Sequence, residues 1–241
     1  MVARIYGDFM KIEPRAVKIY KPEILVCPKC GQQLKYNYTV SNKVVQFTSG
    51  KAFRIKNMGY SCKDCNDDNV YFSQTATKLC FKGYTYSAKT VCMIDYYKNQ
   101  GLGRDAICDI LTQKGIFISD RNVDVLHKKI RSYIDAPYDE LIKEYYNRLL
   151  NEYGKIRISI DLITIKEKCY VLFYDYYKGE ILAIWIFDGL DDPKLNETLT
   201  PYFNNENIEL IVSVRGYVSK FVPILKEISP KNTKFISYLK F

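Results

Sequence analysis

The stretch IRISIDLITIKEKCYVLFYDYYKGEILAIWIF, residues 156–187, holds three runs of β-branched and aromatic residues. Charged or glycine-containing turns separate the runs, at Lys166-Glu167-Lys168 and at Lys178-Gly179-Glu180. Runs of this length, bounded by turn residues, are typical of β-strands. We therefore predict three consecutive strands here, and they decide the class of the domain that contains them.

The sequence after this stretch alternates between helical and strand patterns. A helix is predicted from Pro193 to Asn205, and IELIVSV, residues 208–214, is a fourth, buried strand. A second helix is predicted from Tyr217 to Ile228, and KFISYLKF, residues 234–241, is a fifth strand. The predicted order is three strands, helix, strand, helix and strand, which indicates an α/β domain.

Upstream of these strands, between residues 78 and 153, the apolar residues follow a helical period. One helix begins at Ser87, a second fits Arg104 to Lys114, and a third follows Ser119, a natural N-cap. Gly115 lies in the short turn between the second and third helices, so these two predict a helix-turn-helix, whose second helix enters the major groove of DNA. A connecting helix is predicted from Tyr138 to Tyr153.

Polar residues of this helix-turn-helix are the candidates for contact with DNA. Arg121 and Asn122 lie at the start of its second helix, and their side chains can pair with guanine and adenine in bidentate fashion. Phosphates would be held by Lys128, Lys129 and Arg131, with Arg104 as a further contact. The alternative is a helical bundle whose charged face is only solvated. We expect the outward face to carry Asp120, Arg121, Asn122, Asp124 and Lys128.

Two CxxC pairs, Cys27-Pro-Lys-Cys30 and Cys62-Lys-Asp-Cys65, stand near the N-terminus. Tetrahedral Zn²⁺ is bound by four such thiolates, and each CxxC turn presents two of them. The runs between the pairs alternate and break at Ser41-Asn42 and Ser49-Gly50, which predicts antiparallel strands. We predict a zinc ribbon with one structural Zn²⁺ and no catalytic role, because four protein ligands leave no open position. A redox pair or unligated cysteines are the alternatives.

The charge of the chain favours a polyanionic partner. Lys and Arg number 36 against 27 Asp and Glu, a formal net charge of +9, and cations that neutralise phosphates release counterions from DNA. Colloidal solubility is the other explanation. Lys29 and Lys63, inside the CxxC pairs, would help the ribbon to grip nucleic acid. With no apolar run of about 18–20 residues and no signal-peptide core, we expect a cytoplasmic, nucleoid-associated protein without a membrane partner.

The CPxCG ribbon, the stretch FKGYTYSAKTVCMIDYYKNQGLGRDAICDILTQKGIFISDRNV at residues 81–123, and a strand with a central Asp together resemble DDE-type insertion-sequence transposases. Archaeal and bacterial members of that family place a ribbon and a helix-turn-helix ahead of an RNase H-like nuclease. The resemblance covers most of the chain from about Cys27 onward. It implies an α+β protein of three domains: a zinc ribbon at 1–77, a helix-turn-helix domain at 78–153 and an RNase H-like domain at 154–241 that lacks its last helix.

The resemblance also implies which catalytic groups to look for. Three acids of the family hold two divalent metal ions for attack on a phosphodiester. Asp161 matches the first acid, whereas Arg215, followed by Gly216, stands in place of the second and would repel Mg²⁺. The helix that carries the third acid is expected beyond Phe241, where the sequence ends. We therefore expect that the protein has no catalytic residues and is not an enzyme, and that Asp161 is a vestige of the family's catalytic acids.

These observations predict a domesticated transposase that binds double-stranded DNA without cleaving it, as a regulator of transcription or a chromatin-associated protein. The RNase H-like domain would be a surface for a homodimer or for a protein partner. One alternative is an active transposase or nuclease, complemented by a partner. Another is an adaptor that binds RNA or protein.

Overall fold

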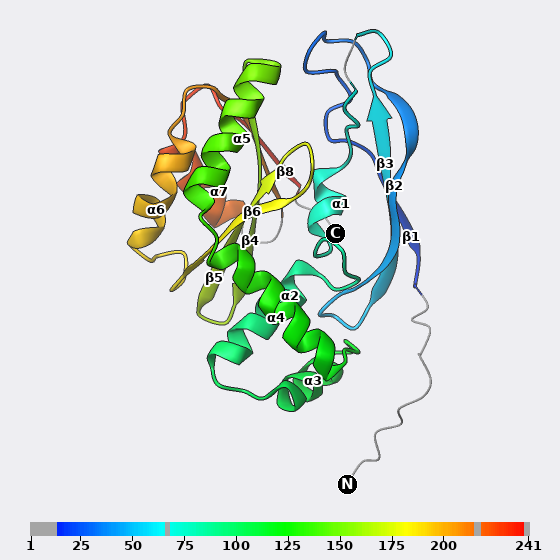
Figure 1. Cartoon of the computed structure of the whole chain (residues 1–241), viewed down its shortest axis with the longest axis vertical. Helices are drawn as coiled ribbons and strands as arrows, with labels where there is room; N and C mark the ends of the chain where they lie inside the picture. Colours follow the sequence, from blue (N-terminus) through cyan, green and yellow to red (C-terminus); the bar gives the residue numbers. More distant parts are fainter. Residues whose placement is uncertain (1–13, 66–67, 215–217, 239–241) are drawn as a thin grey trace.

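The computed structural model of the chain describes residues 14–65, 68–214 and 218–238. These residues form seven helices and two sheets, each with parallel and antiparallel pairs, so the mixed α/β character is confirmed (Figure 1). Across this part of the chain, no helix combines the length and apolar composition needed to span a membrane.

The larger sheet has five strands in the order β6-β5-β4-β7-β8. Strand β5 is antiparallel to both of its neighbours, whereas β4, β7 and β8 are parallel to one another. The predicted succession of three strands, helix, strand, helix and strand is confirmed. Its elements are β4 (Ile156–Ile165), β5 (Lys168–Asp175), β6 (Ile181–Phe187), α6 (Lys194–Phe203), β7 (Ile208–Val214), α7 (Val218–Ile228) and β8 (Lys234–Tyr238).

The smaller sheet has the order β1-β3-β2 and contains the predicted antiparallel pair. The turn predicted at Ser41-Asn42 is wrong: β2 runs through it, and the pairing with β3 shifts register between Thr39 and Ser41 instead. A bulge of this kind bends a strand without ending it. Strand β1, which is parallel to β3, was not predicted. The strands are β1 (Val17–Tyr20), β2 (Lys35–Gln46) and β3 (Ala52–Ser61).

The predicted helices between the sheets are confirmed, and their caps explain where they begin and end. Ser87 and Ser119 accept hydrogen bonds from backbone N–H groups in the first turns of α2 and α4, and Gly154 ends α5 with φ +67°. A short helix that was not predicted, α1, precedes them. The helices are α1 (Gln74–Lys78), α2 (Ala88–Asn99), α3 (Arg104–Gln113), α4 (Asp120–Ile134) and α5 (Tyr138–Tyr153).

Strand β4 is buried on both faces, and its alternating side chains enter two different cores. Ile158 and Ile160 pack with apolar residues of α5, α6 and α7. Ile163 and Ile165 pack with α2, α3 and α4 on the opposite face. The helical segment at 78–153 and the sheet at 154–241 therefore share their hydrophobic cores.

The turn between α3 and α4 touches the turn between β2 and β3. Gly115 and Gly50 both have φ +71°, and a Cβ on Gly115 would lie 2.7 Å from the Gly50 Cα. Gly115 is thus required for two reasons, its left-handed backbone and the space that the β2–β3 turn occupies.

We predict that Gly115→Ala lowers the free energy of unfolding by about 3 kcal/mol, because the strain of a positive φ adds to a steric overlap with backbone. Gly101→Ala is the matched control, since Gly101 has φ +80° and nothing within 4 Å of its Cβ position. It should lose only about 1 kcal/mol. Urea unfolding followed by Trp185 fluorescence measures both; equal losses would contradict the close approach.

Candidate metal centre and nucleic-acid interface

The four cysteines of the CxxC pairs come together in space. The Sγ atoms of Cys27 and Cys65 are 3.6 Å apart, and those of Cys30 and Cys62 are 3.5 Å apart. All four sulfur atoms lie within 4.8 Å of one another. A tetrahedral ion with metal–sulfur bonds of about 2.3 Å separates its sulfur ligands by roughly 3.8 Å. The cluster therefore fits one tetrahedral metal ion.

Backbone groups shape the two turns that carry these cysteines. Gly31 has φ +76°, and its N–H donates to the Cys27 carbonyl at 3.0 Å, which closes the first turn. In the second turn, the Asp64 N–H donates to the Cys62 Sγ at 3.4 Å. That hydrogen bond lowers the pKa of the Cys62 thiol to about 7, whereas burial raises the pKa of Cys27 and Cys65. Thiolate ligands in a tetrahedron suit zinc or iron.

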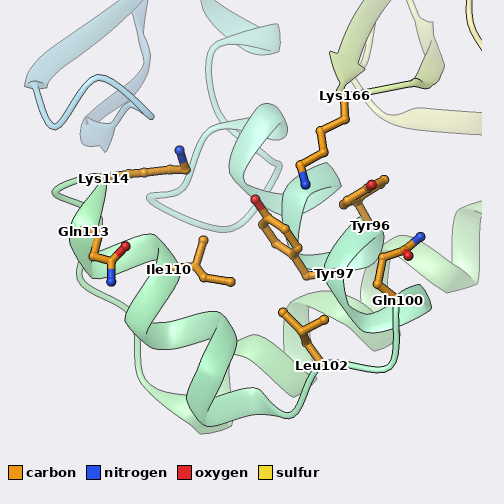
Figure 2. A pocket seen from close by; sticks show the side chains of 8 residues that line it. All are labelled: Tyr96, Tyr97, Gln100, Leu102, Ile110, Gln113, Lys114 and Lys166. Atoms are coloured by element: carbon orange, nitrogen blue, oxygen red, sulfur yellow. The ribbon is translucent and has the colours of Figure 1, made fainter.

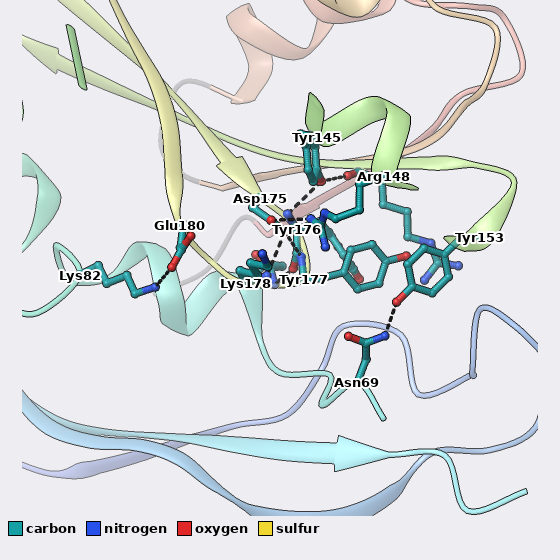
Figure 3. Close-up of polar contacts among 12 residues, drawn as sticks. Asn69, Lys82, Tyr145, Arg148, Tyr153, Asp175, Tyr176, Tyr177, Lys178 and Glu180 are labelled. Carbon is teal, nitrogen blue, oxygen red and sulfur yellow. Dashed lines mark hydrogen bonds and ion pairs between the residues drawn. The ribbon is translucent and has the colours of Figure 1, made fainter. Parts of the chain in front are cut away.

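The metal centre packs against the larger sheet. Cys27 and Cys62 belong to the same core as Tyr177, which follows β5. The ring of Tyr177 stacks on that of Tyr153, with centroids 4.5 Å apart, and the Asn69 side chain donates to the Tyr153 hydroxyl at 2.5 Å (Figure 3). Lys29, predicted to contact nucleic acid, is exposed, and its Nζ lies 5.4 Å from the Tyr153 ring centroid.

Asp175 fixes the β5–β6 turn that supports this contact. Its carboxylate accepts from Arg148 of α5 at 2.6 Å and from the backbone N–H groups of Tyr177 and Lys178 at 2.8 and 2.9 Å (Figure 3). The Asp175 side chain is only 5% exposed, although that of Arg148 is 28% exposed. These hydrogen bonds fix the turn on which the cysteine cluster packs.

Three basic residues of α4 that were predicted to contact DNA are exposed: Arg121, Lys128 and Lys129. Lys63 of the second cysteine turn is exposed as well. Within the described parts of the chain, no carboxylate oxygen comes within 4.0 Å of the charged groups of Arg121, Lys128 or Lys129. The opposite side of α4, with Val123, Leu126 and Ile130, is buried.

The other predicted DNA contacts are differently placed. Arg104 lies 3.5 Å from Asp120 and 3.6 Å from Asp124, so these acids, predicted to face outward, are partly exposed and form ion pairs with α3. Arg131 pairs with Asp135 at 2.7 Å and lies 4.0 Å from the buried Asp95. Asn122 is half-buried beside the Tyr86 hydroxyl. Three basic groups of α4 thus have no ion pair among the described residues, whereas Asp120 and Asp124 pair with Arg104 and Lys98 of neighbouring helices.

Val125 was missed by the sequence analysis. It lies between Arg121 and Lys128 in the chain and is 38% exposed, one of the few large apolar side chains that reach the surface. Its spacing of four residues from Arg121 and three from Lys128 puts the three side chains on one helix face. The helical spacing of these residues could have identified this face.

Asp161 is fully buried, under α2. Its carboxylate accepts from the Leu162 N–H at 3.0 Å, and together with Asp95 it raises the pKa of the buried Cys92 of α2, although burial of Cys92 is the larger cause. Next to it in the sheet, the Nζ of Lys78 donates to the carbonyls of Ile160 and Val212 at 2.7 and 2.8 Å. Arg215, predicted in place of a second acid, lies outside the described residues.

Metal removal tests the cysteine cluster. We predict that the purified chain binds one divalent transition-metal ion, and that chelation lowers its melting temperature by roughly 5–10 °C, the shift expected for a loss of about 3 kcal/mol in a protein of this size. Cys30→Ser should abolish stoichiometric binding, measured by elemental analysis, since Cys30 is exposed and contributes little packing. Cys80→Ser, outside the cluster, is the control, and the idea fails if both variants keep the metal.

Comparisons with known proteins assign no family to the chain. No family model matches it, and it has no match among curated proteins or solved structures. The function therefore has to be inferred from the cysteine cluster, the exposed face of α4 and the surroundings of Asp161.

Proposed function

We propose that this protein binds double-stranded DNA through α4 and its metal-bearing N-terminal segment, that it derives from a DDE-type transposase, and that it does not cleave DNA. In this role it regulates transcription or organises chromatin. The observation that carries the proposal is the difference in pairing on α4: its exposed basic groups Arg121, Lys128 and Lys129 have no acidic partner among the described residues, whereas Asp120 and Asp124 pair with basic groups of α2 and α3.

The exposed face of α4 has the chemistry for a major groove. Arg121 and Lys128 are seven residues apart, about 10 Å along the helix axis, so one can reach a base edge while the other holds a phosphate. Val125 lies between them, and an apolar side chain in that position suits the methyl group of thymine. Asp124 does not oppose this surface, because Lys98 binds its carboxylate at 2.8 Å.

We propose zinc as the metal of the cysteine cluster. Four thiolates close the coordination sphere, so the ion stabilises the fold and takes no part in catalysis. Lys63 next to Cys62 is exposed and adds positive charge at this end of the molecule. The net charge of +9 agrees with a phosphate-rich partner.

The order and direction of the larger sheet support descent from a transposase. The succession of three strands, helix, strand, helix and strand from β4 to β8 is the order expected for an RNase H-like domain without its last helix. The surroundings of Asp161 argue against cleavage. Its carboxylate is buried, and the Lys78 ammonium binds the carbonyl of the preceding residue, Ile160, and that of Val212 in β7, so a positive charge already lies beside this part of the sheet.

One observation favours the adaptor as a second candidate. The smaller sheet exposes several large apolar side chains, and such patches are typical of contacts with a partner protein. A protein partner on this sheet is compatible with duplex DNA on α4. The side chains are Val17, Ile19, Tyr36, Tyr38 and Val40.

Salt dependence tests the duplex interface. We predict that zinc-loaded protein binds duplex DNA with an affinity that falls steeply with salt, and that Lys128→Ala lowers the slope of log K against log salt by about one, because one phosphate contact is lost. Arg121→Ala should cost about 1–3 kcal/mol of discrimination between sites. Fluorescence anisotropy at several salt concentrations measures both.

The matched control for these variants is Lys194→Ala, which removes one exposed lysine from the first turn of α6. Helix α6 belongs to the core on the opposite face of the larger sheet from α4. If all three variants weaken binding equally, the net charge is responsible and α4 is not the interface. Tighter binding to single-stranded RNA than to duplex DNA would favour the adaptor.

A nicking assay separates the proposal from an active nuclease. With supercoiled plasmid and Mg²⁺ or Mn²⁺, we predict no nicking above a protein-free control, because the one acid that matches the family is buried. Asp161→Asn should leave that result unchanged. Metal-dependent nicking that disappears in Asp161→Asn would refute the proposal and support an active or partner-complemented transposase.

A further inference from the structure

A cavity of about 680 Å³ opens between the end of α2, α3 and the β4–β5 turn (Figure 2). This volume is in the range of small-molecule sites, roughly 300–1,000 Å³. None of the residues assigned to the cysteine cluster or to the exposed face of α4 lines it. The cavity is therefore a separate candidate site.

The lining of this cavity combines aromatic, apolar and cationic groups. Tyr97 projects from α2 into the centre, and Ile110 of α3 and Leu102 lie beside its ring (Figure 2). The ammonium groups of Lys114 and Lys166 approach from opposite sides (Figure 2). Amides of two glutamines complete the lining, at Gln100 and Gln113.

The cationic groups of the cavity are available to a ligand. Among the residues that the structure describes, no carboxylate lies within 4.0 Å of the Nζ of Lys114 or Lys166, and no acidic side chain is part of the lining. Glu167, which follows Lys166 in the sequence, accepts a hydrogen bond from the Tyr96 hydroxyl at 2.8 Å. The site is thus suited to an anion.

Lys166 reaches the cavity from the tight turn between β4 and β5. Ile165 pairs with Lys168, so Lys166 and Glu167 form a two-residue hairpin turn, and the φ of +51° at Lys166 is the conformation that such turns need. From this turn the Lys166 side chain points toward the cavity, with its Nζ 5.7 Å from the Tyr96 ring centroid (Figure 2).

We propose that this cavity binds one nucleotide, either free or at the unpaired end of a strand. The base stacks on Tyr97, with Leu102 and Ile110 covering its edge. The phosphate lies between Lys114 and Lys166, and the glutamine amides meet the polar edge of the base. The aromatic ring alone would bind a nucleoside equally well, and the two cations alone would bind inorganic phosphate equally well. Only a nucleotide has both the base and the phosphate that the two parts of the site fit. The inference does not rest on duplex binding by α4.

Calorimetric titration of the zinc-loaded full chain tests the site. AMP, adenosine, inorganic phosphate and a 5′-phosphorylated trinucleotide are the ligands. We expect AMP to bind about tenfold more tightly than adenosine or phosphate, because stacking and charge act together. A trinucleotide that binds more tightly than AMP would assign the site to a strand end, and equal binding would assign it to free nucleotides.

Two variants remove one half of the site each. Lys166→Gly deletes the ammonium and also relieves the positive φ, so its fold should be at least as stable as that of the parent chain. Tyr97→Leu removes the stacking surface. Each should weaken AMP binding about tenfold, whereas Lys178→Gln, an exposed turn lysine at the other end of β5, should not change it. Three results would each overturn the proposal. The first is that neither AMP nor the trinucleotide binds at millimolar concentration. The others are that phosphate binds as tightly as AMP, or that all three variants change AMP binding equally.

Discussion

The hydrogen bonds from the Lys78 ammonium to the backbone of β4 and β7 hold the two halves of the molecule together. Removal of an ammonium from water costs several kcal/mol unless polar groups replace its hydration, and the carbonyls of Ile160 and Val212 supply that replacement. Because Lys78 ends α1, the same contact fixes the chain that leaves the cysteine cluster. This buried charge therefore adds a directional contact to the apolar core that the N-terminal segment shares with the larger sheet.

Much of the fold could be predicted from local patterns. Cap residues such as Ser119 act within one helical turn, and the β-branched residues in 156–165 favour a strand through their own conformational preference. The parallel strand β1 could not be predicted, because four residues with little periodicity gain their structure only from pairing with β3. The bulge in β2 was misread as a turn, since Ser and Asn suit both.

In the candidate sites, too, the features set by local sequence could be predicted, and those set by tertiary packing could not. The cysteine cluster could be predicted because the coordination chemistry of a metal fixes the spacing of its ligands. The acids beside Arg104 could not, because they come from another helix, and the buried Asp95 near Arg131 could not either. Asp135, by contrast, lies four residues after Arg131, a spacing that predicts their ion pair. Lys78 has no signal in the sequence at all: only the packing of α1 on the larger sheet distinguishes it from an ordinary surface lysine.

The shared cores on the two faces of β4 limit how this protein can change. A helix-turn-helix that folds by itself can be exchanged between genes as a module, but here α2, α3 and α4 bury their apolar side chains against Ile163, Ile165 and neighbouring residues of the sheet. A fragment of helices alone would expose that surface to water, and a foreign sheet would not complement it. Recombination at the boundaries of this segment is therefore disfavoured, and adaptation proceeds by substitutions at the surface, where the helices meet their ligands.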